Sequence, residues 1–333
     1  MPLPLFRDTV PTMTPVPASR RVGYAASPGD AAVHAEALAS VPAFREIETG
    51  GEARAAPPSG PLRIAAWNLE RGLFPAESAA LLRQEGAGLV LLSEVDKGCH
   101  RTGQRHATRA VAEALGHRYA FGLEFLELAT MPAPVDFPGN PAENTLGFHG
   151  NAFTTALPFR DPVLIRLDEV ADWFVEPKGG QKRIGTRMAL AAVFRHEGRD
   201  FVGCSVHLES RADFAGRDRQ MVTLLAALDE LAGSLPVVIG GDLNTQVAAG
   251  GHDDPRELLF ETARRQGYDW RAANLASPST RPSRWSPGAE QRQLDWFCTR
   301  GCHVSDPHMV PALAPDGTVL TDHDLISLAV RFG

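Results

Sequence analysis

Short apolar runs that end on a polar side chain recur along this chain. The run Leu89–Leu92, for example, is followed at once by Ser93 and Glu94. Apolar runs of this length, bounded by turn residues, predict buried β-strands. Polar residues stand at the ends of such runs at six places: Asn68, Glu94, His207, Asp242 with Asn244, Asp295, and Asp322 with His323. The pattern predicts strands that carry amide, carboxylate and imidazole groups at their ends.

Helical patterns lie between these runs. Apolar residues recur at helical spacing within residues 76–85, 108–115 and 217–231, and Gly, Pro and Asn residues separate the segments. Alternating strands and helices predict an α/β fold. A chain of 333 residues with 44% hydrophobic content is long enough to bury a large core.

The run from Val237 to Asn244 carries the most chemical information. A short apolar strand reaches the paired glycines Gly240 and Gly241 and is followed by Asp242 and Asn244. The glycines allow close approach of backbone or ligand, and the Asp-x-Asn spacing places both polar side chains on the same side of an extended chain. This arrangement indicates a place where a phosphate and an attacking water are held together. The alternative is a turn in which both side chains bind nearby backbone amides.

The polar positions, taken in order, resemble the motifs of the endonuclease/exonuclease/phosphatase (deoxyribonuclease-like) superfamily. The matching segments are Trp67-Asn68, Ser93-Glu94, Gly150-Asn151-Ala152, Arg187, Val206-His207-Leu208-Glu209, Gly241-Asp242-Leu243-Asn244, Leu294-Asp295-Trp296 and Thr321-Asp322-His323. Each motif is weak alone, but their joint order is specific. The resemblance implies a four-layer α/β/β/α sandwich in which two mixed β-sheets pack face to face.

The resemblance covers residues 62–333, which we expect to form a single catalytic domain. Residues 1–61 differ in composition because they contain many prolines. This composition predicts a largely irregular N-terminal arm with one short helix near residues 30–38. The alternative is a segment that packs beside the cleft or binds another subunit, for which residues 41–44 offer some apolar surface.

The polar set and the resemblance together predict a metal site. Carboxylate and amide oxygens suit Mg²⁺, with Mn²⁺ as an alternative ion. Glu94 is expected to be the main metal ligand, and Asn68 and Asp322 are expected to be further or water-mediated ligands. The alternative for Glu94 alone is an ordinary surface acid at a strand end.

The expected catalytic residues are Asp242, Asn244, His207, Asp295 and His323. Asp242 would orient or deprotonate the attacking water, and Asn244 would donate hydrogen bonds to the phosphoryl group. The resemblance implies that Asp295 holds the imidazole of His323, and whether Asp242 or His323 acts as the base stays open.

The expected phosphate-binding residues are Asn68, Arg187, Asn244 and His207. The resemblance implies that His207 contacts phosphate or assists the leaving group. Arg187 would add a fixed positive charge, although an ordinary ion pair at a strand is an equal alternative. Asn151 is expected to brace the site through backbone hydrogen bonds.

Charge and composition narrow the range of substrates. The net charge of −7 gives no overall basic surface for a nucleic acid backbone, which disfavours nucleic acid as a substrate without excluding it.

The four cysteines have no paired ligand spacing and are expected to be structural thiols. No apolar run is long enough for a membrane span and no secretion signal is present, so a cytoplasmic location is the default expectation.

Two loops are candidate walls of the substrate site. Residues 271–291 combine Arg281, Arg284 and Trp285, and a cation beside an aromatic ring suits a phosphate next to a base or sugar. Residues 121–144 offer an apolar rim.

Taken together, these residues predict a Mg²⁺-dependent phosphodiesterase that uses direct attack by water. The alternatives are a DNA or RNA nuclease and a non-catalytic binding module on the same fold.

Overall fold

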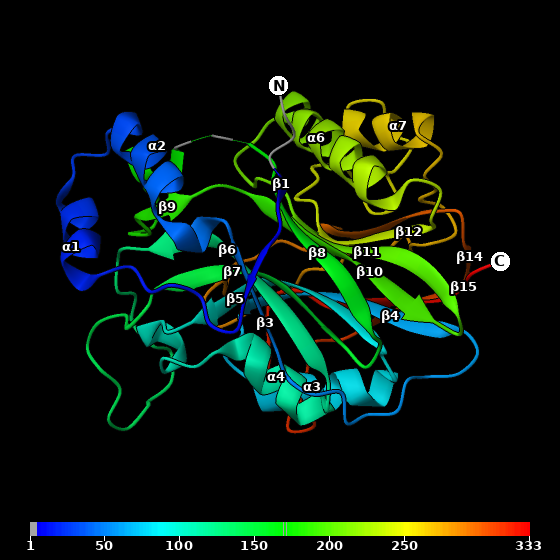
Figure 1. The fold of residues 1–333 in the computed structure, drawn as a ribbon, viewed down its shortest axis with the longest axis horizontal. Coiled ribbons are helices and arrows are strands. Elements are labelled where there is room, and N and C mark those ends of the chain that lie inside the picture. Colours follow the sequence, from blue (N-terminus) through cyan, green and yellow to red (C-terminus); the bar gives the residue numbers. More distant parts are fainter. Residues whose placement is uncertain (1–4, 169, 171) are drawn as a thin grey trace.

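The structure, a computed structural model, describes residues 5–168, 170 and 172–333. Two mixed β-sheets pack against each other, and helices cover both outer faces (Figure 1). The expected four-layer α/β/β/α sandwich is confirmed. No helix of the described part is both long and apolar enough to cross a membrane.

The larger sheet has nine strands. Its order is β14-β15-β4-β5-β7-β6-β3-β2, and β9 pairs with β6. The strands are β2 (Asp8–Val10), β3 (Glu46–Gly50), β4 (Leu62–Arg71), β5 (Leu89–Lys97), β6 (Arg118–Glu127), β7 (Phe148–Thr155), β9 (Arg183–Gly185), β14 (His303–Val310) and β15 (Leu325–Arg331). The pairs β4/β5 and β2/β3 are parallel, and the other pairs are antiparallel.

The smaller sheet has six strands in the order β1-β8-β10-β11-β12-β13. The strands are β1 (Leu5–Phe6), β8 (Phe159–Arg166), β10 (Met188–His196), β11 (Arg199–His207), β12 (Val237–Asp242) and β13 (Asp295–Arg300). Only β11 and β12 are parallel. Since parallel strands end on the same side of a sheet, β4 and β5 in one sheet and β11 and β12 in the other each place two neighbouring strand ends together.

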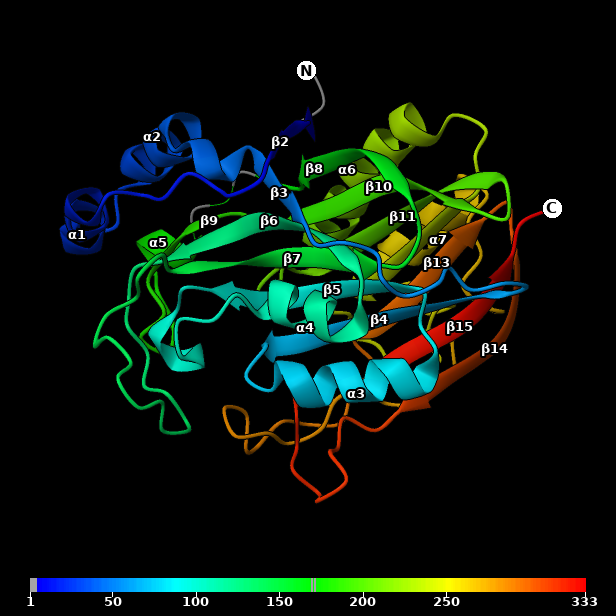
Figure 2. The same ribbon diagram turned by 60° about the horizontal axis from the view of Figure 1, so that its bottom comes forward.

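Helices complete the outer layers. α3 (Pro75–Glu85) and α4 (Ala107–Leu115) cover the nine-stranded sheet, while α6 (Phe214–Ala232) and α7 (Leu258–Arg265) cover the six-stranded sheet (Figures 1 and 2). α1 (Ala18–Ala26), α2 (Ala31–Ser40) and α5 (Asp172–Val175) lie together at one end of the molecule, and short 3₁₀ turns occupy Pro42–Phe44 and His100–Thr102.

The apolar core forms three layers that follow this architecture. The central layer lies between the two sheets and includes Leu89, Leu190 and Phe194, all fully buried. Outer layers fill the space under α3 and α4, with Leu82, and under α6 and α7, with Leu224. Burying each such side chain contributes roughly 1.5–3 kcal/mol, so the sheets form a rigid support for the polar groups at their ends.

The N-terminal segment is more regular than its sequence indicates. The expected helix near residues 30–38 is α2, which Asp30 caps by accepting a hydrogen bond from the Ala32 N–H at 2.7 Å. A second helix and three strands were not expected. β1, β2 and β3 have two, three and five residues, which is too short for periodicity to reveal, and they form because distant strands pair with them.

Candidate active site

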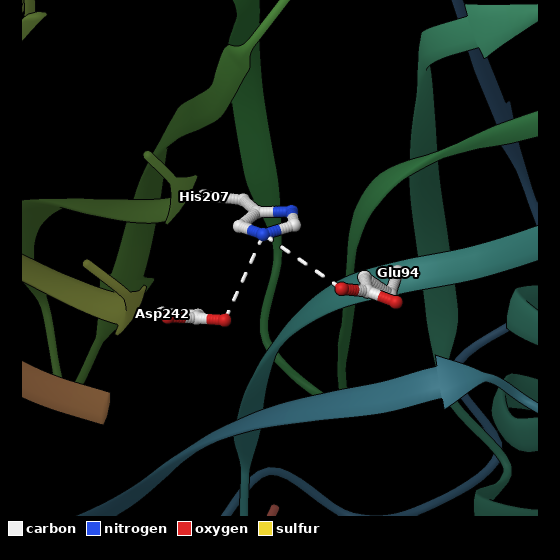
Figure 3. A group of neighbouring side chains, drawn as sticks. All are labelled: Glu94, His207 and Asp242. Atoms are coloured by element: carbon white, nitrogen blue, oxygen red, sulfur yellow. Dashed lines mark ion pairs between the residues drawn. The ribbon is translucent and has the colours of Figure 1, made fainter. Parts of the chain in front are cut away.

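Three strand ends from both sheets converge on one point. Glu94 lies near the end of β5 in one sheet, while His207 and Asp242 end the neighbouring strands β11 and β12 of the other. The His207 Nε2 atom lies 3.8 Å from Glu94 Oε1 and 3.7 Å from Asp242 Oδ2. Figure 3 shows the imidazole edge pointing between the two carboxylates. One ligand atom from each residue falls within 4.8 Å of the others, which suits a metal ion.

Asn68 connects the two sheets at this point. Its side-chain Nδ2 donates to Glu94 Oε1 at 3.2 Å and to Asp242 Oδ2 at 3.1 Å, and the residue is 1% exposed. Its Oδ1 atom accepts the backbone N–H of Glu70 at 2.9 Å. The carboxamide therefore holds both carboxylates in place, while its oxygen already has a backbone partner.

A second imidazole, that of His323, approaches the same oxygen of Asp242. Its Nδ1 is 2.7 Å from Asp295 Oδ2, and its Nε2 is 3.7 Å from Asp242 Oδ2. Ser279 donates to the same Asp295 oxygen at 2.6 Å. Asp322 joins this group, with Oδ1 3.8 Å from the His323 Nε2. The geometry expected for Asp295 and His323 is therefore present.

Asp242 and Asn244 lie at the site and also form a turn. The Asn244 backbone N–H donates to Asp242 Oδ1 at 2.8 Å, and the Asn244 side chain donates to the Leu208 carbonyl at 3.0 Å. Asn244 has a φ of +49°, a left-handed conformation that Asn tolerates better than most residues. The turn fixes one carboxylate oxygen of Asp242 and leaves the other facing the two imidazoles.

Arg187 lies at the site but is surrounded by acids. Its Nη1 is 2.8 Å from Glu124 Oε1, and its Nε is 2.9 Å from Glu209 Oε2. The same Nη1 lies 2.8 Å from the His207 Nδ1, and the arginine is 3% exposed. Two carboxylates thus compensate the charge of Arg187, and its contact with the imidazole holds His207 in place. Asn151 contacts the other sheet, donating to the Met188 carbonyl at 2.8 Å.

Sequence reasoning missed Glu124 and Glu70. Glu124 lies on β6, with Oε2 3.4 Å from the His207 Nδ1. A charged residue within a fully buried strand was the available signal. Glu70 follows Asn68 at the same two-residue spacing that separates Asp242 from Asn244, with the acid and the amide in reverse order, so the two-residue alternation of a strand could have revealed it. Its carboxylate accepts the Asp322 backbone N–H at 3.1 Å.

The electrostatics divide the site into an anionic and a cationic part. Burial would raise the pKa of Glu94, but the charges of His207 and Arg71 hold it well below its usual range. Burial opposes the charged form of His323, yet Asp295, Asp322 and Asp242 raise its pKa well above the ordinary value. Glu94 is therefore ionised and His323 is a cation.

Two further acids have an increased affinity for protons. Burial raises the pKa of Asp242 above its usual value, which suits a group that takes a proton from water. Burial and the nearby Asp322 charge raise the pKa of Glu70 to about 7. Several acids thus lie close together, and a bound cation would reduce the repulsion between their negative charges.

These features define a class: two-sheet α/β proteins with a buried site of carboxylates, amides and imidazoles between strand ends. The endonuclease/exonuclease/phosphatase family model matches residues 65–323. The chain belongs to this family, whose members hydrolyse phosphate esters, and the expected resemblance is confirmed.

Solved structures agree on the fold. An endonuclease/exonuclease/phosphatase from Beutenbergia cavernae is 22% identical with a TM-score of 0.57, covering 82% of this chain and 72% of that one. The human Nocturnin catalytic domain with bound sulfate is 16% identical with a TM-score of 0.56, covering 88% and 98%. A mannosyl-6-phosphatase from Bacteroides thetaiotaomicron is 14% identical with a TM-score of 0.54, covering 81% and 100%. No curated protein sequence matches the chain.

Proposed function

We propose that this protein is a Mg²⁺-dependent phosphodiesterase that uses direct attack by water. The observation that carries the proposal is the convergence of Glu94, His207 and Asp242 from two sheets, with ligand atoms within 4.8 Å of one another. A structural role alone would not require three ionisable side chains at one buried point, because burying charges is costly unless they have a use or a partner.

The residues fit a hard divalent cation. Glu94 is ionised, and Asp322 is close enough for the two carboxylate charges to interact. Asn68 binds Glu94 and Asp242 through its Nδ2 atom, and its Oδ1 atom keeps a second lone pair for a cation. Mg²⁺ would be held by Glu94 with Asn68 and Asp322, and when bound it would neutralise negative charge on a phosphate oxygen. Mn²⁺ has similar ligand preferences and is the alternative ion.

The remaining residues would handle the water and the phosphoryl group. Asp242 would orient the water and accept its proton, since its Oδ2 atom faces both imidazoles and burial raises its pKa. His323, held by Asp295, would place positive charge beside the phosphoryl group. His207 would contact phosphate or the leaving group, and Asn244 retains a second side-chain N–H for a phosphoryl oxygen. Attack by water requires no covalent enzyme intermediate.

Hydrolysis of bis(p-nitrophenyl) phosphate with and without Mg²⁺ tests the proposal. Asp242→Asn keeps the shape of the residue and removes the base, so kcat should fall by about 10²–10⁴-fold. Asp254→Asn is the control, because Asp254 pairs with Arg256 away from the strand ends and its loss should leave the rate unchanged. Wild-type rates in Asp242→Asn, or equal rates after chelation of the metal, would refute the mechanism.

Two measurements distinguish a small diester, a monoester and a nucleic acid as substrate. A phosphodiesterase should hydrolyse bis(p-nitrophenyl) phosphate faster than the monoester p-nitrophenyl phosphate. A nuclease would instead cleave plasmid DNA or RNA oligonucleotides with a rate that falls steeply with salt. Rapid polymer cleavage with little diester turnover would replace the small-substrate assignment.

A further inference from the structure

A second arginine lies at the site in different surroundings from those of Arg187. Arg71 is the last residue of β4, three positions beyond Asn68. Among residues 5–168, 170 and 172–333, no acid forms an ion pair with Arg71, and its buried Nε atom has no hydrogen-bond partner. Since Glu124 and Glu209 compensate Arg187, Arg71 is the guanidinium near the site that keeps its capacity to bind an anion.

Arg71 lies next to the main metal-site acid. In the register of the parallel strands β4 and β5, Arg71 stands opposite Val95, the residue that follows Glu94. A phosphate bound beside Glu94 would therefore lie within the field of the Arg71 charge.

The backbone of β4 is distorted where it presents Arg71. The register between β4 and β5 shifts between Asn68 and Arg71. Glu70 and Arg71 have φ values of +41° and +80°, in the left-handed region that such side chains rarely adopt. Strained conformations of this kind persist where surrounding contacts hold them, and they concentrate at functional sites. Here the distortion directs two successive side chains toward one loop.

That loop is bound to both residues. The Arg71 guanidinium lies 4.9 Å from the centre of the Trp285 ring, and the indole is half-buried. Glu70 accepts hydrogen bonds from Ser283 at 2.6 Å and from Ser286 at 3.2 Å. The two serines on either side of Trp285 thus fix the ring against Arg71. Arg71 and Trp285 together form a preorganised surface next to the metal-site residues.

Building on the proposed function, we propose that Arg71 binds the substrate phosphate and that Trp285 contacts a ring attached to it, which makes the substrate a phosphate ester of a nucleoside or sugar. Guanidinium groups bind phosphate oxygens in pairs, and indole rings stack on bases. The loop also borders a hollow of about 440 Å³, whose lining mixes polar residues such as Thr280 and Gln291 with Pro278, Pro282 and Val319. Such a mixed lining suits a ring that carries polar groups.

Two esters with the same leaving group separate the contributions of Arg71 and Trp285. They are thymidine 5′-(p-nitrophenyl phosphate) and methyl p-nitrophenyl phosphate. Arg71→Gln should lower kcat/KM for both esters by about tenfold to a hundredfold, the effect of a charge-assisted hydrogen bond. Trp285→Leu should lower kcat/KM by about tenfold for the thymidine ester alone, because the methyl ester has no ring to stack.

Arg265→Gln is the matched control for the loss of an arginine. Arg265 lies on α7, outside the loop, where it is exposed and forms an ion pair with Glu261. Its loss should change either rate by less than about twofold, as for most surface substitutions. Circular dichroism and thermal unfolding confirm that each variant folds. An equal loss in Arg265→Gln, or an equal effect of Trp285→Leu on both esters, would overturn the proposal.

Binding of thymidine 5′-monophosphate, measured by calorimetry, tests the same contacts without turnover. Arg71→Gln should weaken binding by at least about tenfold, whereas Arg265→Gln should not. Wild-type affinity in Arg71→Gln, or hydrolysis of sphingomyelin vesicles that greatly exceeds hydrolysis of the thymidine ester, would overturn the assignment. If Asp242→Asn stays active, the proposed function fails; if it is inactive while Arg71→Gln is unaffected, only the present inference fails.

Discussion

At the scale of single residues, each imidazole of the site has its own carboxylate. Asp295 lies against His323 and Glu124 against His207. The motif order predicted the first pair, because Asp295 and His323 both belong to recognisable segments. The second pair was hidden because Glu124 belongs to no motif, and only the packing of the two sheets brings it to His207.

Glu124→Gln should lower kcat by about ten- to a hundredfold with little change in KM, because a carboxylate that orients a functional histidine acts through the reacting groups. Glu209→Gln is the matched control. Glu209 also pairs with Arg187 but forms no ion pair with His207 among the described residues. Steady-state kinetics on bis(p-nitrophenyl) phosphate give both constants. Similar kcat losses in the two variants would assign the effect to Arg187 instead.

His117 makes the stability depend on pH in a defined direction. Burial lowers its pKa from 6.5 to about 4, so between these values the unfolded chain binds more protons than the folded one. Stability contributed by neutral His117 is complete above pH 6.5 and falls as the pH decreases toward 4. The loss amounts to about 3 kcal/mol at most.

His117→Gln removes this titration, so its stability should depend less on pH in that window. Urea unfolding at pH 7 and pH 4.5 measures the difference. Wild type should lose about 2 kcal/mol more than the variant between the two values. Equal losses would mean that His117 is protonated in the folded protein.

At the scale of secondary-structure elements, the sequence predicted strands and helices well where they are long and apolar. The segments that supply Asn68, Glu94, His207 and Asp242 were all identified because each strand is buried on both faces and reads as a continuous apolar run. The strands of residues 5–50 could not be identified in this way. Their stability comes from hydrogen bonds to β6 and β8, which no local pattern encodes.

Glu48 on β3 ties this N-terminal region to the catalytic sheet. Its fully buried carboxylate pairs with Lys97, accepts the Met13 N–H at 2.9 Å, and lies 2.8 Å from the His106 Nε2. Glu48→Gln leaves Lys97 with an uncompensated buried charge, so the free energy of unfolding should fall by about 3 kcal/mol. Urea unfolding measures this loss.

The control is Glu36→Gln, since Glu36 forms an exposed ion pair with Arg20. Exposed pairs contribute little, so its loss should cost less than about 1 kcal/mol. If both variants lose the same stability, the buried cluster is not a special contributor and the N-terminal segment is held by packing alone.

At the scale of the whole molecule, the site joins the two sheets, because Glu94 and Asp242 come from different sheets and Asn68 binds both. A cation held by Glu94 and its neighbours should stabilise the fold, because it binds the folded chain and not the unfolded one. At a Mg²⁺ concentration of a hundred times the Kd, the expected gain is about 2.7 kcal/mol. Thermal unfolding with and without Mg²⁺ should show this rise in wild type, and Glu94→Gln should show much less. An unchanged rise in Glu94→Gln would reject Glu94 as the ligand.

The first residues have a consequence for handling and engineering of the chain. β1 and β2 are the outermost strands of different sheets, and only Arg7 separates them. A chain that started after Val10 would expose the unpaired backbone of β8 and of β3. Bare strands of this kind recruit strands from other molecules, so such a truncated protein should aggregate even though its catalytic residues are all present.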